Sequence, residues 1–265
     1  MKIFRRCWIF FVLLFMYAPI LVLAVYSFTD AKMIGQVNSL SFSNYVTLFT
    51  SEELVSMIWG TFVLAIGVAI LSTLLGTVGA VGSFYSKKTS QYLIEMANQI
   101  PVVNADVVTG FSVCVLMIGI FTISKDTFIP LVVGQTVLCL PFVYLSVMPR
   151  LKQMDLELYE AALDLGCTPA KALIKVVLPQ IVPGIISGFV TAITLSLDDY
   201  FIATYTKPAA FDTISTYVVN ATKGSQTEIK TALWALSTVI FVVVVVLVCL
   251  SNSNSKDKNT FLVEK

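Results

Sequence analysis

Long apolar runs with few charges recur along this chain and restrict it to folding within a membrane. A helix of roughly 20 apolar residues spans a bilayer core. Six runs approach or reach that length: 7–28, 57–85, 107–124, 128–148, 184–205 and 233–250. Only 12% of the residues are charged, against about a quarter in soluble domains. We therefore predict an all-α, polytopic membrane protein with six transmembrane helices.

The first run follows Lys2, Arg5 and Arg6, an arrangement that is also found in signal peptides. The apolar core of a signal peptide has roughly 7–15 residues and precedes a small-residue cleavage site. The run here is longer, and no clear Ala-x-Ala site follows it. This favours an uncleaved first helix.

The basic residues set an orientation, because lysine and arginine accumulate in cytoplasmic segments. With the N-terminus inside and six spans, both termini are cytoplasmic. Of the 17 Lys and Arg residues, all then lie in cytoplasmic segments except Lys32, Lys125, Lys207, Lys223 and Lys230.

Composition excludes several classes of function. The chain has no histidine, its five cysteines form no Cys-x-x-Cys pair, and its net charge is +1. These features give no support to a histidine-based enzyme, a metal site, a disulfide framework or a nucleic-acid binder. No nucleotide-binding P-loop is present either, so we expect no enzyme activity, no cofactor and no metal in this chain.

Small residues recur in two of the apolar runs. The second run contains glycine at positions 60, 67, 76, 79 and 82, and the fifth begins with Gly184 and Gly188. Because small residues let helices approach closely in lipid, we interpret these glycines as helix-packing positions.

A polar segment at 149–180 separates the fourth and fifth runs. The sequence predicts a short amphipathic helix with Asp155 as its N-cap and Gly166 as its left-handed C-terminal stop. Thr168 and Pro169 then begin a second helix, which we expect to end at Pro179. Composition alone leaves open a passive loop that lies on the membrane surface.

The spacing of residues in this segment resembles the EAA loop of ATP-binding-cassette (ABC) importer permeases. The motif places Glu160-Ala161-Ala162 before Gly166, with Val176 and Leu178-Pro179 following at the family's intervals. Val176 replaces the more common isoleucine. The resemblance implies a MetI-like ABC permease fold: one transmembrane domain over 1–265, a cytoplasmic coupling loop at 149–180 and a cytoplasmic tail at 251–265.

The resemblance also implies how the loop works. Glu160, Ala161, Ala162, Gly166 and the Leu178-Pro179 pair would couple it to a separate ATPase dimer, which binds the ATP and Mg²⁺. Closure of that ATPase would rock the spans between outward and inward openings.

Two adjacent carboxylates, Asp198 and Asp199, interrupt the fifth run. Each costs roughly 2.5–3.5 kcal/mol at mid-bilayer, so such groups usually face a bundle interior or a watery path. Asp198 lies about 14 residues beyond Gly184, or roughly 21 Å, in the outer half of the membrane. Neighbouring helical positions point about 100° apart, so one carboxylate can line a path while the other fixes a neighbouring helix. The alternative is that both are structural, capping a broken helix or pairing with Lys207.

Aromatic residues follow the acidic pair: Tyr200, Phe201 and Tyr205. Carboxylates with aromatic faces suit an organic polycation, through charge pairing and cation–π attraction. The substrate-pathway candidates are therefore Asp198, Asp199, Tyr200 and Tyr205.

Several segments are similar to the second permease (C) subunit of spermidine/putrescine importers. They are Leu195 to Asp199, Leu140-Pro141-Phe142, Arg150-Leu151-Lys152 and Glu160 to Gly166, and the likeness extends from about residue 17 to 240. It implies a homologous B-type permease partner, an external polyamine-binding protein and a bacterial inner-membrane location.

A family segment Pro-Asp-Ile-Val corresponds here to Ala105-Asp106-Val107-Val108. Asp106 is thus a further pathway candidate, although an N-cap of the third span is the favoured interpretation. Rival functions are an importer permease for another organic cation, an iron chelate, an oxyanion or a sugar, and a secondary transporter that needs no ATPase.

Overall fold

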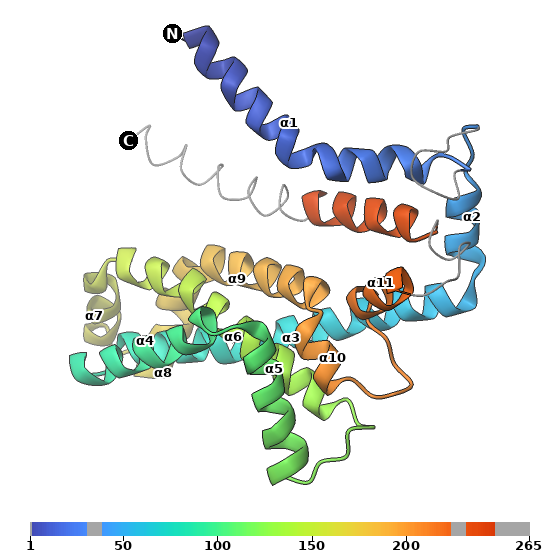
Figure 1. Ribbon diagram of the computed structural model, residues 1–265. Helices are drawn as coiled ribbons and strands as arrows, with labels where there is room; N and C mark the ends of the chain where they lie inside the picture. Colours follow the sequence, from blue (N-terminus) through green and yellow to red (C-terminus); the bar gives the residue numbers. More distant parts are fainter. Residues whose placement is uncertain (1, 31–38, 224–231, 247–265) are drawn as a thin grey trace. The chain divides into compact units, whose positions relative to one another are not determined.

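A computed structural model describes residues 2–30, 39–223 and 232–246 of the chain (Figure 1). The described residues are almost entirely helical and group into two compact units, 2–58 with 217–246 and 59–216. The elements are α1 Lys2–Ser27, α2 Ser43–Thr50, α3 Glu52–Phe84, α4 Lys88–Val103, α5 Asp106–Cys114, η1 Val115–Ile120, α6 Ile129–Gln153, α7 Leu156–Asp164, α8 Pro169–Ala172, η2 Leu173–Val177, α9 Leu178–Asp198, α10 Phe201–Thr206 and α11 Ile214–Lys223, where η marks a π-helix.

Within the described residues, four helices are long and apolar enough to cross a membrane: Arg6–Ser27, Glu52–Phe84, Ile129–Gln153 and Pro169–Asp198. A fifth span exists if Lys88–Val103 and Asp106–Ile120, which meet at 103°, count as one broken span. A shorter apolar helix covers Ala232–Val246. The expected sixth span, 233–250, continues past the described residues, as does the whole of the expected tail at 251–265.

The first unit is held together around the turn between α1 and α2. The buried Asn44 donates to the carbonyls of Ser27 and Thr29 at 3.2 and 2.9 Å. The hydroxyl groups of Ser27 and Tyr45 form a hydrogen bond of 2.5 Å. One amide side chain thus satisfies carbonyls at the end of α1 that have no partner within the helix.

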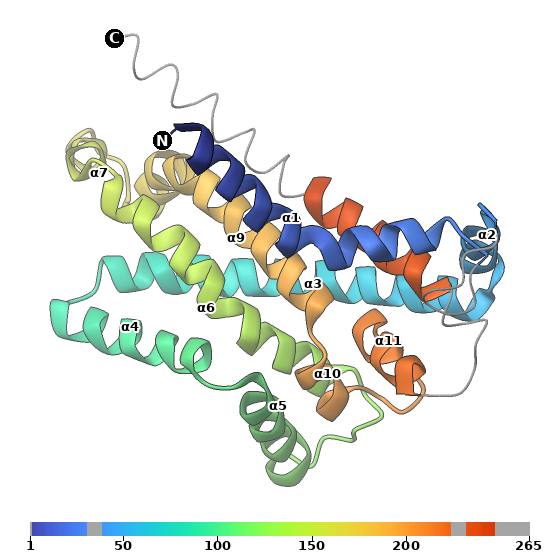
Figure 2. The same ribbon diagram turned by 45° about the horizontal axis from the view of Figure 1, so that its top comes forward.

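The second unit is built around α6, which packs against α9 along most of its length (Figure 2). Its core includes Leu131, Val143 and Val147 of α6 and Ile181 and Ala192 of α9. Glycine makes the close approach possible: a Cβ on Gly76 of α3 would lie 2.8 Å from Val143 Cγ1. The small-residue interpretation is therefore confirmed at position 76, and at Gly184 and Gly188, whereas Gly67, Gly79 and Gly82 have open space beside them.

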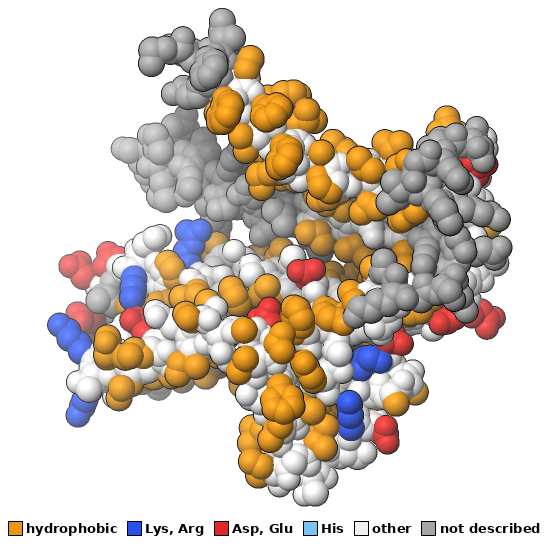
Figure 3. Space-filling view, in the orientation of Figure 1, with side chains coloured by type: hydrophobic (Ala, Val, Ile, Leu, Met, Phe, Trp, Pro, Cys, Tyr) orange, Lys and Arg blue, Asp and Glu red, His pale blue; other side chains and the backbone are white. Residues whose placement is uncertain are grey.

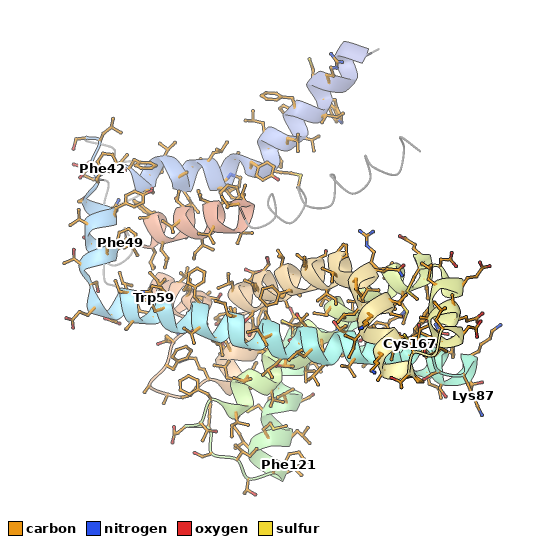
Figure 4. All side chains as sticks on the ribbon, turned by 180° about the vertical axis from the view of Figure 1, so that it is seen from behind. Phe42, Phe49, Trp59, Lys87, Phe121 and Cys167 are labelled. Carbon is orange, nitrogen blue, oxygen red and sulfur yellow. The ribbon has the colours of Figure 1, made fainter. Side chains whose placement is uncertain are left out.

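The ends of the second unit differ in chemistry. Lys87, in the turn before α4, and Cys167, in the turn after α7, lie at the same end, and Trp59 lies at the other end of α3 (Figure 4). Basic side chains from the α3–α4 turn and the 149–180 segment therefore share one end of the unit.

The predicted helix stop at Pro179 is wrong. The chain continues as a helix from Pro169 to Asp198, and a π-helical stretch, η2, directly precedes α9. A proline within a helix clashes with the carbonyl four residues earlier. The wider π turn before Pro179 accommodates the ring, so the helix is not interrupted.

Two helices were not expected from the sequence. The short helix α2 precedes the second apolar run, and α4 fills the polar segment after it. The predicted third span, 107–124, corresponds to α5 and η1 and ends earlier, at Ile120.

Replacing Gly184 by alanine should lower the thermal stability of the assembled, detergent-solubilised protein. The added methyl would lie 2.9 Å from the Ser146 carbonyl oxygen and 3.3 Å from Val147 Cα, and backbone atoms of α6 cannot move cheaply. Overpacking of this kind costs about 1–3 kcal/mol. Gly67→Ala is the matched control, because its methyl meets nothing within 4 Å. Equal melting temperatures for the two variants would contradict the prediction.

Candidate functional site

The long helix ends at Asp198, and the chain turns before α10 begins. Asp199, the next residue, is only 7% exposed. Its Oδ1 accepts a hydrogen bond from the amide of Ile202, and its Oδ2 accepts one from the amide of Ala203, both at 3.0 Å. Amides at the start of a helix have no partner within it, and this carboxylate, one residue before the N-cap position held by Tyr200, satisfies two of them.

Gln135, in the second turn of α6, connects both sides of the break. It is fully buried, and its Nε2 donates to Asp199 Oδ2 at 3.0 Å. Its Oε1 accepts from Ser196 Oγ on α9 at 2.8 Å. Ser215 Oγ adds a bond to the Leu197 carbonyl at 2.8 Å. We call Gln135, Ser196 and Asp199 the helix-break network.

Two glycines make room for α10 beside α5 and α6. A Cβ on Gly134 would lie 2.6 Å from Ile202 Cγ2, and one on Gly110 would lie 3.0 Å from Ile202 Cα. Tyr205 packs edge-on against Phe111 of α5, with ring centroids 6.0 Å apart. The helix-break network and these contacts together fix α10 against the core.

The remaining pathway candidates lie at or near the surface. Asp198, at the end of α9, and Asp106, at the start of α5, are exposed. Tyr200 is half-buried and packs against Phe201 at 5.2 Å. Figure 3 shows isolated acidic side chains among hydrophobic ones over the end of α9 and the start of α5. The two adjacent aspartates therefore have different surroundings, one open and one fully engaged.

Two sequence interpretations need correction here. Ala105 holds the N-cap position of α5, and Asp106 is its first helical residue, so Asp106 is not the cap. Lys207 pairs with Asp212 at 2.8 Å and donates to the Phe211 carbonyl at 2.9 Å. Lys207 is therefore committed to its own loop rather than to the aspartate pair.

Gln135 was not among the predicted site residues. A single amide in an otherwise apolar stretch of the fourth run was the available signal. A buried amide needs hydrogen-bond partners, and here they are Asp199 and Ser196, which lie outside α6. The partner could not be identified from the sequence, because it lies 64 residues away.

The 149–180 segment, which we call the EAA loop, has the local structure predicted for it. Asp155 Oδ1 accepts from the amide of Glu157 at 3.0 Å and caps α7, as expected. Gly166 has φ +84°, so the left-handed stop is confirmed. Its amide donates to the Leu163 carbonyl at 2.9 Å, and the Cys167 amide donates to Ala162 at 3.1 Å, which is the Schellman pattern. Thr168 and Pro169 start α8, as predicted.

The EAA loop has an inner and an outer face. Ala162 and Ala172 are buried within the chain, and α7 packs against α8 and η2. Glu160, Ala161 and Gly166 are exposed. The motif thus offers one glutamate and one alanine to an external surface, while its second alanine packs inside. Leu178 and Pro179 are also exposed, at the start of α9.

Aromatic rings attach the loop to the end of α3. Tyr159 of α7 lies 5.1 Å from Tyr85, which in turn contacts Phe84 at 5.2 Å between ring centroids. These two ring contacts hold α7 against the end of α3.

Among the described residues, several helices are long enough to span a membrane, and a compact loop lies between two of them, which is typical of the class of multi-span transport permeases. The chain is a member of the family described as binding-protein-dependent transport system inner membrane component, whose match covers residues 1–254. This is a family of transport permeases of the inner membrane and not an enzyme family.

Curated relatives have the same class of function. The chain is 30% identical over 240 residues to the putrescine transport system permease protein PotI of Escherichia coli strain K12, covering 87% of this chain and 83% of the relative. It is 26% identical over 255 residues to the spermidine/putrescine transport system permease protein PotC of Haemophilus influenzae, covering 96% and 97%.

A solved structure confirms the fold. A chain from the crystal structure of a bacterial ABC transporter that imports the acidic polysaccharide alginate superposes with a TM-score of 0.68. The match covers 97% of this chain and 98% of that chain at 20% identity. The MetI-like permease fold expected from the EAA motif is thereby confirmed.

Proposed function

We propose that this chain is one permease subunit of an ABC importer for polyamines such as putrescine and spermidine. It pairs with a homologous B-type permease, with which it forms the translocation path. An extracytoplasmic binding protein delivers the polyamine, and an ATPase dimer that holds ATP and Mg²⁺ engages the EAA loop. Both termini lie in the cytoplasm.

One observation supports the substrate class above all: the exposed carboxylate of Asp198 stands at the end of a long apolar helix. An exposed charge at such a position is expensive unless it faces a watery path or a cation. Asp199 does not share this role in the proposal, because its two oxygens already accept three hydrogen bonds.

Asp106 and the nearby aromatic residues extend the acidic surface. Asp106 begins α5, which packs directly against α10. The ring pairs Tyr200–Phe201 and Phe111–Tyr205 lie on these same elements. Ammonium groups separated by methylene chains can pair with the carboxylates and pack on the rings through cation–π attraction.

The EAA loop supplies the coupling. Glu160 and Ala161 form its exposed face, and the ring contact between Tyr159 and Tyr85 ties it to α3. The loop is also continuous with α9 through α8 and η2. Movement of the loop by the ATPase is therefore passed to α9 and α3 together, which favours alternation between two rigid arrangements.

Asp198→Asn should lower polyamine uptake at least several-fold while the complex still assembles. The change keeps the size of the side chain and removes its charge, and Asp198 is exposed, so the fold loses little. We would measure labelled putrescine and spermidine uptake in cells that co-express this chain with its candidate partner permease, ATPase and binding protein.

Asp126→Asn is the control, since the same chemical change removes an exposed carboxylate from the loop between η1 and α6. Uptake kinetics unchanged in Asp198→Asn would exclude Asp198 from the path. If the wild-type complex assembles and hydrolyses ATP but takes up no polyamine, the importer class stands and the polyamine substrate is rejected.

A further inference from the structure

A groove between α4 and α6 lies apart from the acidic surface described above. Its cavity has a volume of about 380 Å³, within the range of small-molecule sites. Glu95, Asn98 and Gln99 of α4 and Gln153 of α6 supply polar groups, while Tyr144 and Met148 of α6 supply an apolar floor.

An ammonium group already occupies the acidic position in this groove. Lys152 Nζ lies 3.0 Å from Glu95 Oε1 and donates a hydrogen bond to it. The two side chains are 52% and 32% exposed, and ion pairs this accessible contribute little to stability. A second cation can therefore displace Lys152 at small cost.

The lining combines hydrogen-bond acceptors with apolar surface, and this combination suits a linear amine. The carboxylate of Glu95 and the amide oxygens of Asn98 and Gln99 accept hydrogen bonds from ammonium groups. Tyr144 Oη donates to Ser83 Oγ at 2.9 Å, so its hydroxyl is already engaged and the residue contributes mainly apolar surface. Methylene segments between ammonium groups would lie along that surface.

We propose that this groove is a second, inner-side site for the transported alkylammonium substrate, in which Lys152 and the substrate compete for Glu95. The inference rests on the proposed polyamine function. Lys152 is a primary ammonium tethered at the site, chemically equivalent to the end of the substrate. When it returns to Glu95 it expels the substrate, so the site binds transiently and releases toward the end of the unit that carries Lys87 and the EAA loop.

The competition separates this site from a simple ion pair. Removal of either member breaks an ion pair, so a purely structural pair predicts effects in the same direction from both substitutions. A competitive site predicts opposite effects. Glu95→Gln removes the acceptor and weakens substrate binding, whereas Lys152→Met removes the competitor and strengthens it. The double variant should behave as Glu95→Gln, because no carboxylate remains to be freed.

The test uses the complete transporter, with its partner permease, ATPase and binding protein, purified and reconstituted in liposomes. We would measure equilibrium binding of labelled spermidine to the nucleotide-free transporter, and spermidine uptake with ATP. Lys152→Met should raise the binding affinity several-fold and slow release, and Glu95→Gln should lower the affinity several-fold. Lys88→Met, an exposed cation at the start of α4, should match the wild type.

Shifts of the same sign in Glu95→Gln and Lys152→Met, or no shift in either, would overturn the inner site while wild-type uptake upholds the proposed function. A wild-type complex that neither binds nor transports spermidine would overturn both. The two failures are therefore distinguishable within one set of measurements.

Discussion

Replacing Asp199 by alanine is expected to remove most of the folded protein from the membrane, and transport with it. The carboxylate accepts hydrogen bonds from Gln135 Nε2 and from the amides of Ile202 and Ala203 in a buried position. Each buried donor left without a partner costs about 1–3 kcal/mol. Three such losses together are large beside a total stability of about 5–15 kcal/mol.

The neighbouring residue provides the control. Asp198→Ala alters an exposed side chain one position away and should leave the amount and melting temperature of the assembled complex near the wild type. Both quantities can be measured by fluorescence-detected size-exclusion chromatography after heating. Normal assembly of Asp199→Ala with weakened substrate affinity would show instead that Asp199 faces the path.

The network also predicts coupling between residues on different helices. Gln135→Leu should destabilise the protein less than Asp199→Ala, because Asp199 keeps its two amide donors. The double variant should be less destabilised than the sum of the single effects, since both changes remove the same hydrogen bond.

Substitutions at Gly166 are expected to reduce ATP-driven transport in the order of their left-handed preference. Gly166 has φ +84°, where residues other than glycine lose about 1–2 kcal/mol and asparagine loses less. Uptake and substrate-stimulated ATP hydrolysis should therefore decrease from glycine to asparagine to alanine to valine. The alanine variant should lose transport several-fold.

Space does not explain this order, because a Cβ at Gly166 would meet nothing within 4 Å. Gly79→Ala is the matched control: its methyl is equally unobstructed, but the residue lies inside α3. Complex yield separates a coupling defect from a folding defect. An asparagine variant worse than alanine, or an alanine variant equal to the wild type, would contradict the assigned role of the turn.

Local signals in the sequence predicted the parts of the fold that depend on a few neighbouring residues. Asp155, Gly166, Thr168 and Pro169 each act within one turn of chain, and the structure confirms all four positions. The apolar runs likewise predicted the long spans, because length and hydropathy are properties of a single segment.

Features that depend on distant residues were not predicted. The end of α9 at Asp198 is fixed by Gln135 on another helix and by Ser215 beyond α10, neither of which is close in sequence. The helix continues past Pro179 because a π turn precedes it, and we know no residue pattern that predicts such a turn. Helix α4 was not predicted, because its amide side chains and Glu95 make the segment polar. In the structure, several of these polar side chains line a groove.

The unbroken helix from Pro169 to Asp198 also bears on how this protein can diverge. Its 30 residues extend about 45 Å and join the EAA loop, for which we propose contact with the ATPase, to Asp198, for which we propose contact with the polyamine. A substitution that twists or tilts one end of the helix therefore also moves the other end. Changes in substrate preference and changes in ATPase contact should arise together, and natural variants are expected to pair substitutions at the two ends of this helix.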